Sequence, residues 1–356
     1  MDKTKKISII GAGPVGAYSA YLLSDHYDVS IYEEHKTVGN PVQCTGIVTP
    51  RINEVIKIPH ELIVNRIKYA RINSPDGNSV KIKIDDIILD RGAFDRHVFE
   101  KAVEKGAKAH LNTRFVDYDV KTGNVKFKSD DKEFTKHTDI LIGADGAASR
   151  VRSHVTKRKV EFYIGKQATV EGNFEREIFD VYFNVDGFFT WVVPENESIA
   201  RIGYGYKKFD KRYDDFVKSY GKILGYQAGP IPMFNPMLRT QRGNVYIAGD
   251  AASQIKSTTG GGIIQGMLGA KALSESIIKN KNYEIEWRKK LFKELYIHEK
   301  IRNKLDRFSA KDYNELVGIL SKEKIRHTLE KTNRDNFSKV LIQLMKEPKL
   351  FKYAFK

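Results

Sequence analysis

The chain has 356 residues, 41% hydrophobic and 30% charged, which is the composition of a globular protein long enough to hold two domains. Its single cysteine, Cys44, excludes an internal disulfide and a zinc site built from several cysteines. The net charge of +16 indicates either a lysine-rich surface that keeps the protein soluble or an attraction to phosphate groups. We recognise no nucleic-acid-binding motif, so lipid or a phosphorylated substrate ranks ahead of nucleic acid, and no metal is expected.

The N-terminal segment predicts a strand, a turn and a helix. An apolar run from Ile7 to Leu23 follows three lysines, as in a signal peptide, but small or helix-breaking residues interrupt it. We expect a strand over residues 5–10, a helix over about 15–24 and a second strand over 28–32, which together form a βαβ unit. No other apolar run approaches the length that crosses a bilayer, so we expect a cytoplasmic protein.

The pattern Gly11-x-Gly13-x-x-Gly16 between the first strand and helix predicts a dinucleotide-binding turn. The first glycine permits the tight turn, the second lets a pyrophosphate approach the backbone, and the third permits close packing of helix on sheet. The helix N-terminus favours negative charge. Glu33 ends the second strand, 22 residues after Gly11, where a carboxylate accepts hydrogen bonds from a ribose. This pattern alone does not distinguish NAD from FAD.

Apolar patterns predict the elements that follow. They are alternating segments near 66–72 and 78–84, a helix over 95–106, a buried strand over 138–143, and β-structure from about 160 to 206 with turns at Gly172, Gly187 and Gly203. A further buried strand is expected over 244–248, then a helix over 260–280 and helices over 281–356. In this last stretch apolar residues recur at near-helical spacing, at Trp287, Leu291, Leu295, Ile301 and Leu305 and again at Phe337, Val340, Leu341 and Leu344. Residues 274–356 carry 21 Lys and Arg against 12 Asp and Glu.

Three later signals favour FAD over NAD. The strand over 138–143 runs into Asp145-Gly146 and then into arginines, although a surface turn capped by Ser149 explains this pattern equally well. The strand over 244–248 runs into Gly249-Asp250, whose carboxylate is placed to accept from a ribityl hydroxyl. The glycines 260–262 then open a helix whose N-terminus stabilises the anion of a reduced flavin. A cofactor that reaches from the first turn to this second loop is long, which indicates FAD.

The expected fold class is therefore mixed α/β, with a Rossmann-like FAD-binding domain interleaved with an antiparallel β-sheet substrate domain and followed by C-terminal helices. The FAD-binding domain is predicted over residues 1–56, 90–155 and 241–280, the substrate and catalytic domain over 57–89 and 156–240, and the helical region over 281–356.

The three glycine-containing segments resemble the FAD-binding motifs of the para-hydroxybenzoate-hydroxylase-like flavoproteins. Within that group the chain resembles the geranylgeranyl reductase family over about residues 5–280. The segment 41–46 resembles the family's Cys-Gly loop, 89–95 its arginine-led helix start, and 187–194 its Tyr-x-Trp-x-Phe-Pro segment. The sequence departs from the family pattern at Thr45, Asp186, Phe189, Val193 and Ser257.

This resemblance implies FAD as cofactor and a set of residues that hold it: Gly11, Gly13, Gly16, Glu33, Cys44, Thr45, Arg91, Val116, Asp250, Gly262 and Ile263. It implies catalytic roles for Cys44, Phe189 and Trp191, with Phe188 as a further candidate for the substrate pocket; packing in the core is the alternative for each. The reaction implied is reduction of isolated C=C bonds in the geranylgeranyl chains of isoprenoid membrane-lipid precursors. The implied substrate is an isoprenoid lipid or isoprenyl phosphate or diphosphate, and the external electron donor is NADPH, a reduced deazaflavin or ferredoxin.

Two other functions stay open. The first is an FAD-dependent aromatic monooxygenase or halogenase, because halogenases carry a Trp-x-Trp-x-Ile-Pro segment similar to 189–194, although Phe189 stands in place of the first Trp. The second is a membrane-surface protein that keeps FAD as a structural group. The basic C-terminal helices either lie on anionic lipid at the inner face of the cell membrane or pack on the FAD-binding domain.

Overall fold

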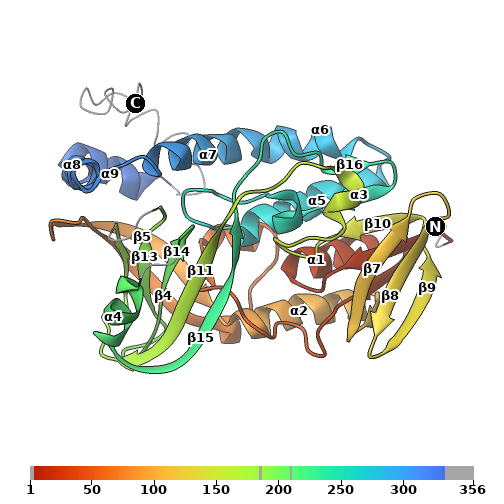
Figure 1. The fold of residues 1–356 in the computed structure, drawn as a ribbon, viewed down its shortest axis with the longest axis horizontal. Helices are drawn as coiled ribbons and strands as arrows, with labels where there is room; N and C mark the ends of the chain where they lie inside the picture. Colours follow the sequence, from red (N-terminus) through yellow and green to blue (C-terminus); the bar gives the residue numbers. More distant parts are fainter. Residues whose placement is uncertain (1–3, 184–186, 209–210, 333–356) are drawn as a thin grey trace. The chain divides into compact units, whose positions relative to one another are not determined.

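The computed structural model describes residues 4–183, 187–208 and 211–332 (Figure 1). The chain forms two compact units, each assembled from three separate stretches of sequence. Unit 1 consists of Met1–Val42, Arg91–Glu161 and Pro232–Leu295, and unit 2 consists of Gln43–Asp90, Phe162–Ile231 and Tyr296–Lys356.

Unit 1 is built on a six-stranded sheet of order β16-β17-β10-β1-β2-β6. Its strands are β1 (Lys6–Ile10), β2 (Asp28–Tyr32), β6 (Lys108–His110), β10 (Ile140–Gly143), β16 (Gln241–Arg242) and β17 (Val245–Ile247). All neighbours pair parallel except β16, which runs antiparallel at one edge. The helical elements are α1 (Pro14–Leu23), α2 (Arg91–Glu104), α3 (Arg152–Val155), η3 (Gly249–Ala252), α5 (Ile263–Ile278), α6 (Tyr283–Trp287) and the π-helix η4 (Arg288–Phe292).

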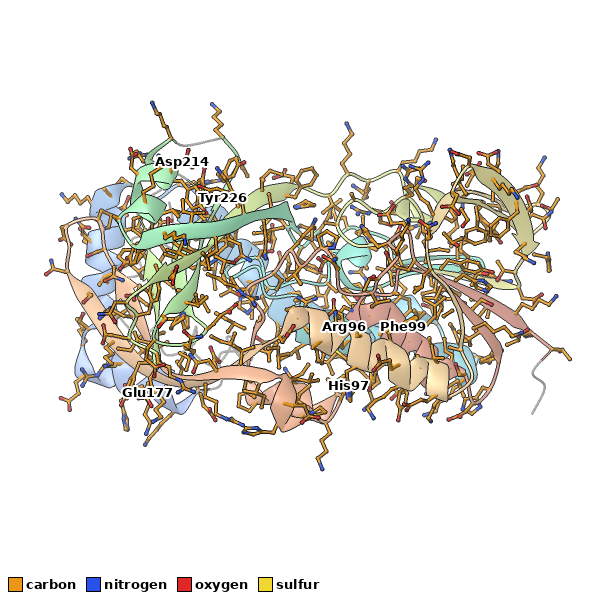
Figure 2. All side chains as sticks on the ribbon, turned by 90° about the horizontal axis from the view of Figure 1, so that it is seen from below. Arg96, His97, Phe99, Glu177, Asp214 and Tyr226 are labelled. Carbon is orange, nitrogen blue, oxygen red and sulfur yellow. The ribbon has the colours of Figure 1, made fainter. Side chains whose placement is uncertain are left out.

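Alternating side chains of β1 separate two cores. Ile7 and Ile9 pack with the apolar residues of α1 and α5 on one face of the sheet. Ile10 belongs to the core on the other face, where Tyr32 stacks on Phe127 with ring centroids 3.9 Å apart. Phe127 comes from a three-stranded antiparallel sheet, β7 (Thr113–Asp119), β8 (Asn124–Ser129) and β9 (Lys132–His137), which the sequence patterns did not predict. On α2, Figure 2 shows Arg96, His97 and Phe99, of which Phe99 packs against the first core.

Unit 2 is built on an eight-stranded sheet of order β15-β11-β14-β13-β12-β4-β5-β3. Its strands are β3 (Ile47–Val48), β4 (Ile63–Asn73), β5 (Ser79–Leu89), β11 (Phe162–Gly172), β12 (Ile178–Tyr182), β13 (Thr190–Pro194), β14 (Ile199–Tyr206) and β15 (Gly221–Pro232). The helical elements are η1 (Pro50–Glu54), η2 (His60–Leu62), α4 (Arg212–Lys218), α8 (Ala310–Leu320) and α9 (Glu323–Lys331), while α7 (Lys293–Leu305) begins in unit 1 and continues into unit 2. At the β15 edge, Lys166 of β11 forms an ion pair with Asp214 at 3.2 Å and lies over the ring of Tyr226. Asp214 and Tyr226 are labelled in Figure 2.

The mixed α/β class with a Rossmann-like half is confirmed by this architecture. The turn predicted at Gly203 is wrong, because Gly203 lies inside β14 and pairs with Trp191 of β13. The helix predicted over 95–106 begins earlier, at Arg91, and the helix predicted over 260–280 begins after the glycines, at Ile263. The helical spacing at Phe337, Val340, Leu341 and Leu344, and the departure at Asp186, lie outside the described residues.

The C-terminal helices are divided between the units. Trp287, Leu291 and Leu295 join the core of unit 1, whereas α8 and α9 bury Val317, Leu320 and other apolar residues against β5 in unit 2. The apolar face of α8 and α9 is thus covered by the sheet. Within the part of the chain that the structure describes, no helix is long and apolar enough to cross a bilayer.

Candidate functional site

The glycine turn after β1 combines two tight contacts with one open position. Gly11 has φ +99°, and a Cβ atom added to it would lie 2.5 Å from the carbonyl oxygen of Ala144. A Cβ on Gly16 would lie 2.0 Å from the carbonyl oxygen of Gly11. A Cβ on Gly13, the N-cap of α1, would meet no atom within 4 Å. The first and third glycines therefore pack strand, helix and β10 together, and the second leaves the space in which a pyrophosphate fits beside the helix N-terminus.

Glu33 is held directly beside this turn. Its Oε2 accepts the backbone N–H of Ala12 at 2.8 Å. Its Oε1 accepts the backbone N–H of His35 at 3.0 Å and contacts the imidazole Nδ1 at 2.6 Å. The carboxylate is therefore fixed next to the glycine turn, where a ribose would meet it.

Asp250, Arg91 and Gly262 lie close together beyond the carboxyl end of β17, at the same edge of the sheet as the glycine turn. A Cβ on Gly262, the residue that precedes α5, would lie 2.8 Å from Asp250 Oδ1. Burial raises the pKa of Asp250, and the positive charges of Arg91 and Arg152 partly offset this rise. Arg91, the first residue of α2, donates from Nε and Nη2 to the two carboxylate oxygens of Asp95, each at 3.1 Å. A buried carboxylate between two guanidinium groups and a helix start is well placed to accept a hydroxyl hydrogen bond.

Asp145, the acid in the turn after β10, binds backbone groups of its own turn. A local role of this kind was one of the two interpretations of the sequence here. Asp145 Oδ2 accepts the backbone N–H groups of Arg150 at 2.8 Å and Val151 at 3.1 Å. Ser149 Oγ accepts the N–H of Arg152 at 3.0 Å. Burial nevertheless raises the pKa of Asp145. Asp145 and Ser149 together bind the backbone N–H groups at the entry to the short helix α3, whose first residue Arg152 acts electrostatically on Asp250.

The loop 256–262 is closed by its own backbone. Lys256 N–H donates to the carbonyl of Gly261 at 3.1 Å, and Gly260 N–H donates to the carbonyl of Lys256 at 2.9 Å. Ser257, where the family pattern has proline, is fully buried and accepts the N–H of Phe234 at 2.9 Å. A proline has no hydroxyl that accepts this bond, so the departure at Ser257 ties the loop to the segment that precedes β16.

The last two predicted cofactor residues of unit 1 lie in distinct settings. Ile263 is the first residue of α5 and follows the glycine loop directly. Val116 lies at a β-bulge of β7, since Phe115 pairs with Phe127 and Asp117 with Lys126, and no residue of β8 pairs with Val116 itself. A bulge re-aims the local side chain and backbone, which distinguishes Val116 from its neighbours on the strand.

In unit 2, the Cys44 loop is attached to β14. The carbonyl oxygen of Cys44 accepts a hydrogen bond from Arg201 Nη1 at 3.0 Å, and Arg201 also forms an ion pair with Glu195. The half-buried thiol accepts the N–H of Gly46 at 3.4 Å, with Thr45 between the two residues. The Sγ atom is thus oriented by the turn that follows it.

Trp191, on β13, covers the face of the neighbouring strand β14 from which the Arg201 side chain projects. Its ring occupies the space that a Cβ on Gly203 would take, and residues 201 and 203 point to one side of the strand. The indole N–H donates to Gln167 Oε1 at 3.4 Å, and Gln167 Nε2 donates to Gln227 at 2.6 Å. The structure therefore brings the Cys44 backbone and the Trp191 ring to one face of the sheet.

The three aromatic residues of the segment 188–191 differ in exposure. Phe188 is 1% exposed and packs against Gly205 and Tyr163, which makes it a core residue. Phe189 stacks on Phe188 with centroids 4.3 Å apart and meets Trp191 edge-on at 5.8 Å. Phe189 and Trp191 are half-buried, so these two rings remain the candidates for contact with a substrate.

Two family models, two curated proteins and a solved structure are similar to this chain. The model for an FAD binding domain matches residues 89–212, and the model for an NAD(P)-binding Rossmann-like domain matches residues 9–54. The digeranylgeranylglycerophospholipid reductase of Methanothrix thermoacetophila is 25% identical over 95% of this chain and 96% of its own length, and the protein of the same name from Methanocaldococcus jannaschii is 25% identical over 98% and 96%. A geranylgeranyl bacteriochlorophyll reductase-like protein from Thermoplasma acidophilum superimposes with a TM-score of 0.85 over 98% of this chain and 99% of its own, at 21% identity.

The chain is a flavin-dependent oxidoreductase that is similar over almost its whole length to the digeranylgeranylglycerophospholipid reductases. FAD is its cofactor, as the glycine turn, Asp250 and the loop 256–262 predicted. The p-nitrophenol 4-monooxygenase of Pseudomonas putida, with a TM-score of 0.72 at 15% identity over 96% of this chain and 99% of its own, shares the fold alone.

Sequence patterns missed several residues that shape this site. Gln167 and Arg201 hold Trp191 and the Cys44 loop through contacts between separate strands. Gly203 was predicted as a turn residue, although the segment 200–203 also matches the family pattern that follows the aromatic segment. The short motif Ala200-Arg201-Ile202-Gly203 was the signal for two of them, because a charge and a glycine at alternate positions share one face of a strand.

Proposed function

We propose that this protein is an FAD-dependent reductase that saturates isolated C=C bonds in the geranylgeranyl chains of archaeal-type membrane-lipid precursors. The observation that carries the proposal is the length of the match to the digeranylgeranylglycerophospholipid reductases, which spans almost the whole of both chains rather than the nucleotide-binding turn alone. The substrate-side residues of unit 2 are therefore included in the likeness, together with the FAD-side residues of unit 1.

Saturation of one double bond adds a hydride to one carbon and a proton to the other, and it consumes two electrons. Bound FAD in its reduced form supplies the hydride. An isolated trisubstituted alkene has no carbonyl to accept charge, so positive charge develops on the more substituted carbon. The half-buried rings of Phe189 and Trp191 stabilise this charge by a cation–π interaction of about 1–2 kcal/mol for each well-placed ring.

The remaining residues would bind FAD and orient it for the reaction. Gly11, Gly13 and Gly16 with the start of α1 accommodate the pyrophosphate, and Glu33 accepts from the ribose. Arg91 neutralises phosphate charge, Asp250 accepts from a ribityl hydroxyl, and the backbone at Gly262 and Ile263 offers N–H groups at the start of α5. Cys44 and Thr45 form a loop of unit 2, and the Cys44 thiol would supply the proton that the second alkene carbon receives. Val116, at its bulge, would contact the nucleotide half of the cofactor.

The direct test is an anaerobic reaction of dithionite-reduced, FAD-loaded protein with digeranylgeranylglyceryl phosphate, followed by mass spectrometry of the lipid. The product is expected to gain mass in steps of two hydrogens. Trp191→Leu is expected to slow this gain, whereas Trp287→Phe, which alters a tryptophan buried in the core of unit 1, should leave the rate near that of the parent. An unchanged lipid mass with FAD bound would reject the proposal. NADPH, a reduced deazaflavin and reduced ferredoxin, supplied separately in place of dithionite, identify the electron donor by turnover.

An aromatic monooxygenase or halogenase is the second candidate, because such enzymes share the fold with TM-scores of 0.72 for the p-nitrophenol 4-monooxygenase and 0.72 for a flavin-dependent brominase. NADPH-driven oxygen uptake that depends on an aromatic substrate, without reduction of the lipid, would favour it. Phe189, in place of the first tryptophan of the halogenase segment, argues against halogenation.

We also propose that the protein contacts anionic lipid at the inner face of the cell membrane, through electrostatic attraction. Since α8 and α9 turn their apolar residues toward β5, lysines rather than inserted apolar side chains would make this contact. Binding to vesicles with phosphatidylglycerol should then disappear as salt rises from 0.05 to about 0.5 M, because exposed charges are screened.

A further inference from the structure

We infer that Arg302, near the end of α7, is the positioning residue that fixes the aromatic segment Gly187–Trp191 of unit 2. The inference rests on the proposed function, in which Phe189 and Trp191 face the alkene. It assigns to the C-terminal helix a role in the reaction that is separate from any contact with lipid.

The guanidinium of Arg302 forms one bond that orients it and a second bond that fixes the aromatic segment. Its Nε donates to Asp306 Oδ1 at 2.6 Å, four residues on and directly after the end of α7. Its Nη2 donates to the carbonyl oxygen of Gly187 at 2.7 Å, 115 residues away in sequence. The ion pair with Asp306 therefore orients the guanidinium, and the guanidinium fixes the start of the aromatic segment.

The backbone at Gly187 needs such a contact. Gly187 has φ +104°, a conformation that strains other residues and that glycine adopts without steric cost. Without a Cβ atom it has no side chain to pack, so its position depends on hydrogen bonds to the backbone. Arg302 supplies one of these from outside the segment.

The same guanidinium lies against the first ring of the stack. Its Cζ is 5.2 Å from the centroid of Phe188 and 5.9 Å from that of Tyr163. Phe188 in turn stacks on Phe189, which meets Trp191 edge-on. A displacement of Phe188 is thus passed through two ring contacts to the rings proposed to face the substrate.

Burial makes the choice of arginine informative. Arg302 is 1% exposed, and taking a charge out of water costs several kcal/mol that an apolar residue of similar size would avoid. What an arginine adds here is a directed donor to the Gly187 carbonyl and a planar cation on the Phe188 ring. Both act on the segment 187–191.

The test combines two variants with a spectroscopic reporter. The chain has two tryptophans, so Trp287→Phe leaves Trp191 as the sole emitter. In that background, Arg302→Met keeps the bulk of the side chain and removes its charge and donors, while Arg302→Lys keeps the charge and one donor group. We expect Arg302→Met to raise the acrylamide quenching constant of Trp191 at least twofold, and Arg302→Lys to restore part of the difference.

Kinetics distinguish positioning from simple stability. With the geranylgeranyl lipid, Arg302→Met is expected to lower kcat by roughly tenfold with a smaller change in KM, since a small misplacement of a reacting group acts on the transition state. The dissociation constant of FAD should be unchanged, because Arg302 contacts Gly187, Phe188, Tyr163 and Asp306, and none of these is proposed to hold FAD.

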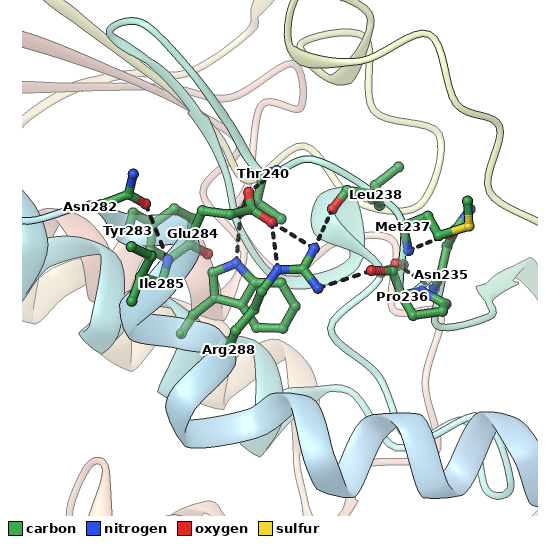
Figure 3. A network of polar contacts seen from close by, with 12 residues as sticks. Asn235, Pro236, Met237, Leu238, Thr240, Asn282, Tyr283, Glu284, Ile285 and Arg288 are labelled. Carbon is green, nitrogen blue, oxygen red and sulfur yellow. Dashed lines mark hydrogen bonds and ion pairs between the residues drawn. The ribbon is translucent and has the colours of Figure 1, made fainter.

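Arg288 offers a matched control in unit 1 (Figure 3). It donates to the backbone carbonyls of Pro236 at 2.9 Å and Leu238 at 3.0 Å, pairs with Glu284, and lies 4.8 Å from the Trp287 ring centroid. Arg288→Met therefore removes the same kinds of contact from a structural position. It should lower thermal stability and leave both the Trp191 quenching and kcat at the parent values.

Each outcome decides the inference. If Arg302→Met lowers only the melting temperature and leaves Trp191 quenching and kcat at the parent values, Arg302 is structural and the inference is overturned. If Arg302→Met does not fold, Asp306→Asn weakens the orientation of the guanidinium and should raise quenching in the same direction; no rise would overturn the inference. If the parent protein reduces no lipid, the proposed function fails, while the fluorescence measurement still decides whether Arg302 fixes Trp191.

Discussion

The indole of Trp191 lies so close to the backbone of Gly203 that a Cβ atom at residue 203 would stand 2.4 Å from its Cζ2 atom. The two residues are direct neighbours on the antiparallel strands β13 and β14. Residue 203 must therefore be glycine, because the indole ring of Trp191 on the adjacent strand fills the space that a side chain would need.

Gly203→Ala is expected to push the Trp191 ring away from the sheet. Overpacking of this kind destabilises a protein by about 1–3 kcal/mol, and the displaced ring should also lower kcat on the lipid. Gly225→Ala on the edge strand β15 is the control, since a Cβ there meets no atom within 4 Å. Urea unfolding and single-turnover lipid reduction measure the two effects. Equal stability and rate for both variants would contradict this account of Gly203.

Gly13→Ala is expected to weaken FAD binding without damage to the fold. A Cβ at Gly13 meets no atom of the protein within 4 Å, so it would occupy the space left for the pyrophosphate. We expect the dissociation constant of FAD to rise about 100-fold, equivalent to roughly 3 kcal/mol. Titration of the apoprotein with FAD, followed by flavin fluorescence, measures this change.

Two other glycines act as controls for that experiment. Gly318→Ala in α8 also places a Cβ in open space, and it should stabilise the helix by about 0.5–1 kcal/mol with no change in FAD affinity. Gly16→Ala should instead destabilise the fold itself, because its Cβ would meet the Gly11 carbonyl oxygen at 2.0 Å. Unaltered FAD affinity in Gly13→Ala would remove that residue from the cofactor site.

The sequence could predict those features whose cause lies within a short stretch of chain. The turn Gly11–Gly16 is one example, because strand, turn and helix follow one another and each glycine has a steric reason inside the unit. Gly203 was misjudged because its reason is a ring on another strand. Arg302 and Gln167 were missed because their partners lie 115 and 24 residues away. Contacts of this kind depend on strand order and register, which the spacing of apolar residues does not encode.

Asp250→Asn is expected to stabilise the apoprotein at neutral pH. Burial raises the pKa of Asp250 above its ordinary value of 3.8, although Arg91 and Arg152 offset part of this rise. Above the raised pKa, the folded state carries a poorly solvated charge that the unfolded state solvates freely. As pH falls from the raised value toward 3.8, the folded state takes up the proton first, so this contribution to the free energy of unfolding increases.

Urea unfolding of the apoprotein between pH 4 and 8 measures this contribution. The asparagine variant should gain on the order of 1 kcal/mol over the parent at pH 7, and the gain should shrink as pH falls. The same variant should bind FAD less tightly, because an amide is a weaker acceptor for a ribityl hydroxyl than a carboxylate. Asp131→Asn, at a fully exposed carboxylate, should change neither quantity. A less stable Asp250→Asn apoprotein at pH 7 would show that the arginines outweigh burial.

Alkylation of Cys44 tests the proposed proton donor without any change to the backbone. The chain has one cysteine, so iodoacetamide modifies a single thiol, and Cys44→Ala serves as the unreactive control. Loss of a general acid typically lowers the rate by about 10²–10⁴-fold, and we expect both the alkylated protein and Cys44→Ala to lose lipid reduction to that extent. Cys44→Ser, which keeps an O–H in place of the S–H, should retain more activity than Cys44→Ala. Since the thiol accepts the Gly46 N–H at 3.4 Å, its hydrogen stays available for transfer. Reduction at the parent rate by Cys44→Ala would assign the proton to another group and leave Cys44 as a residue of the FAD loop.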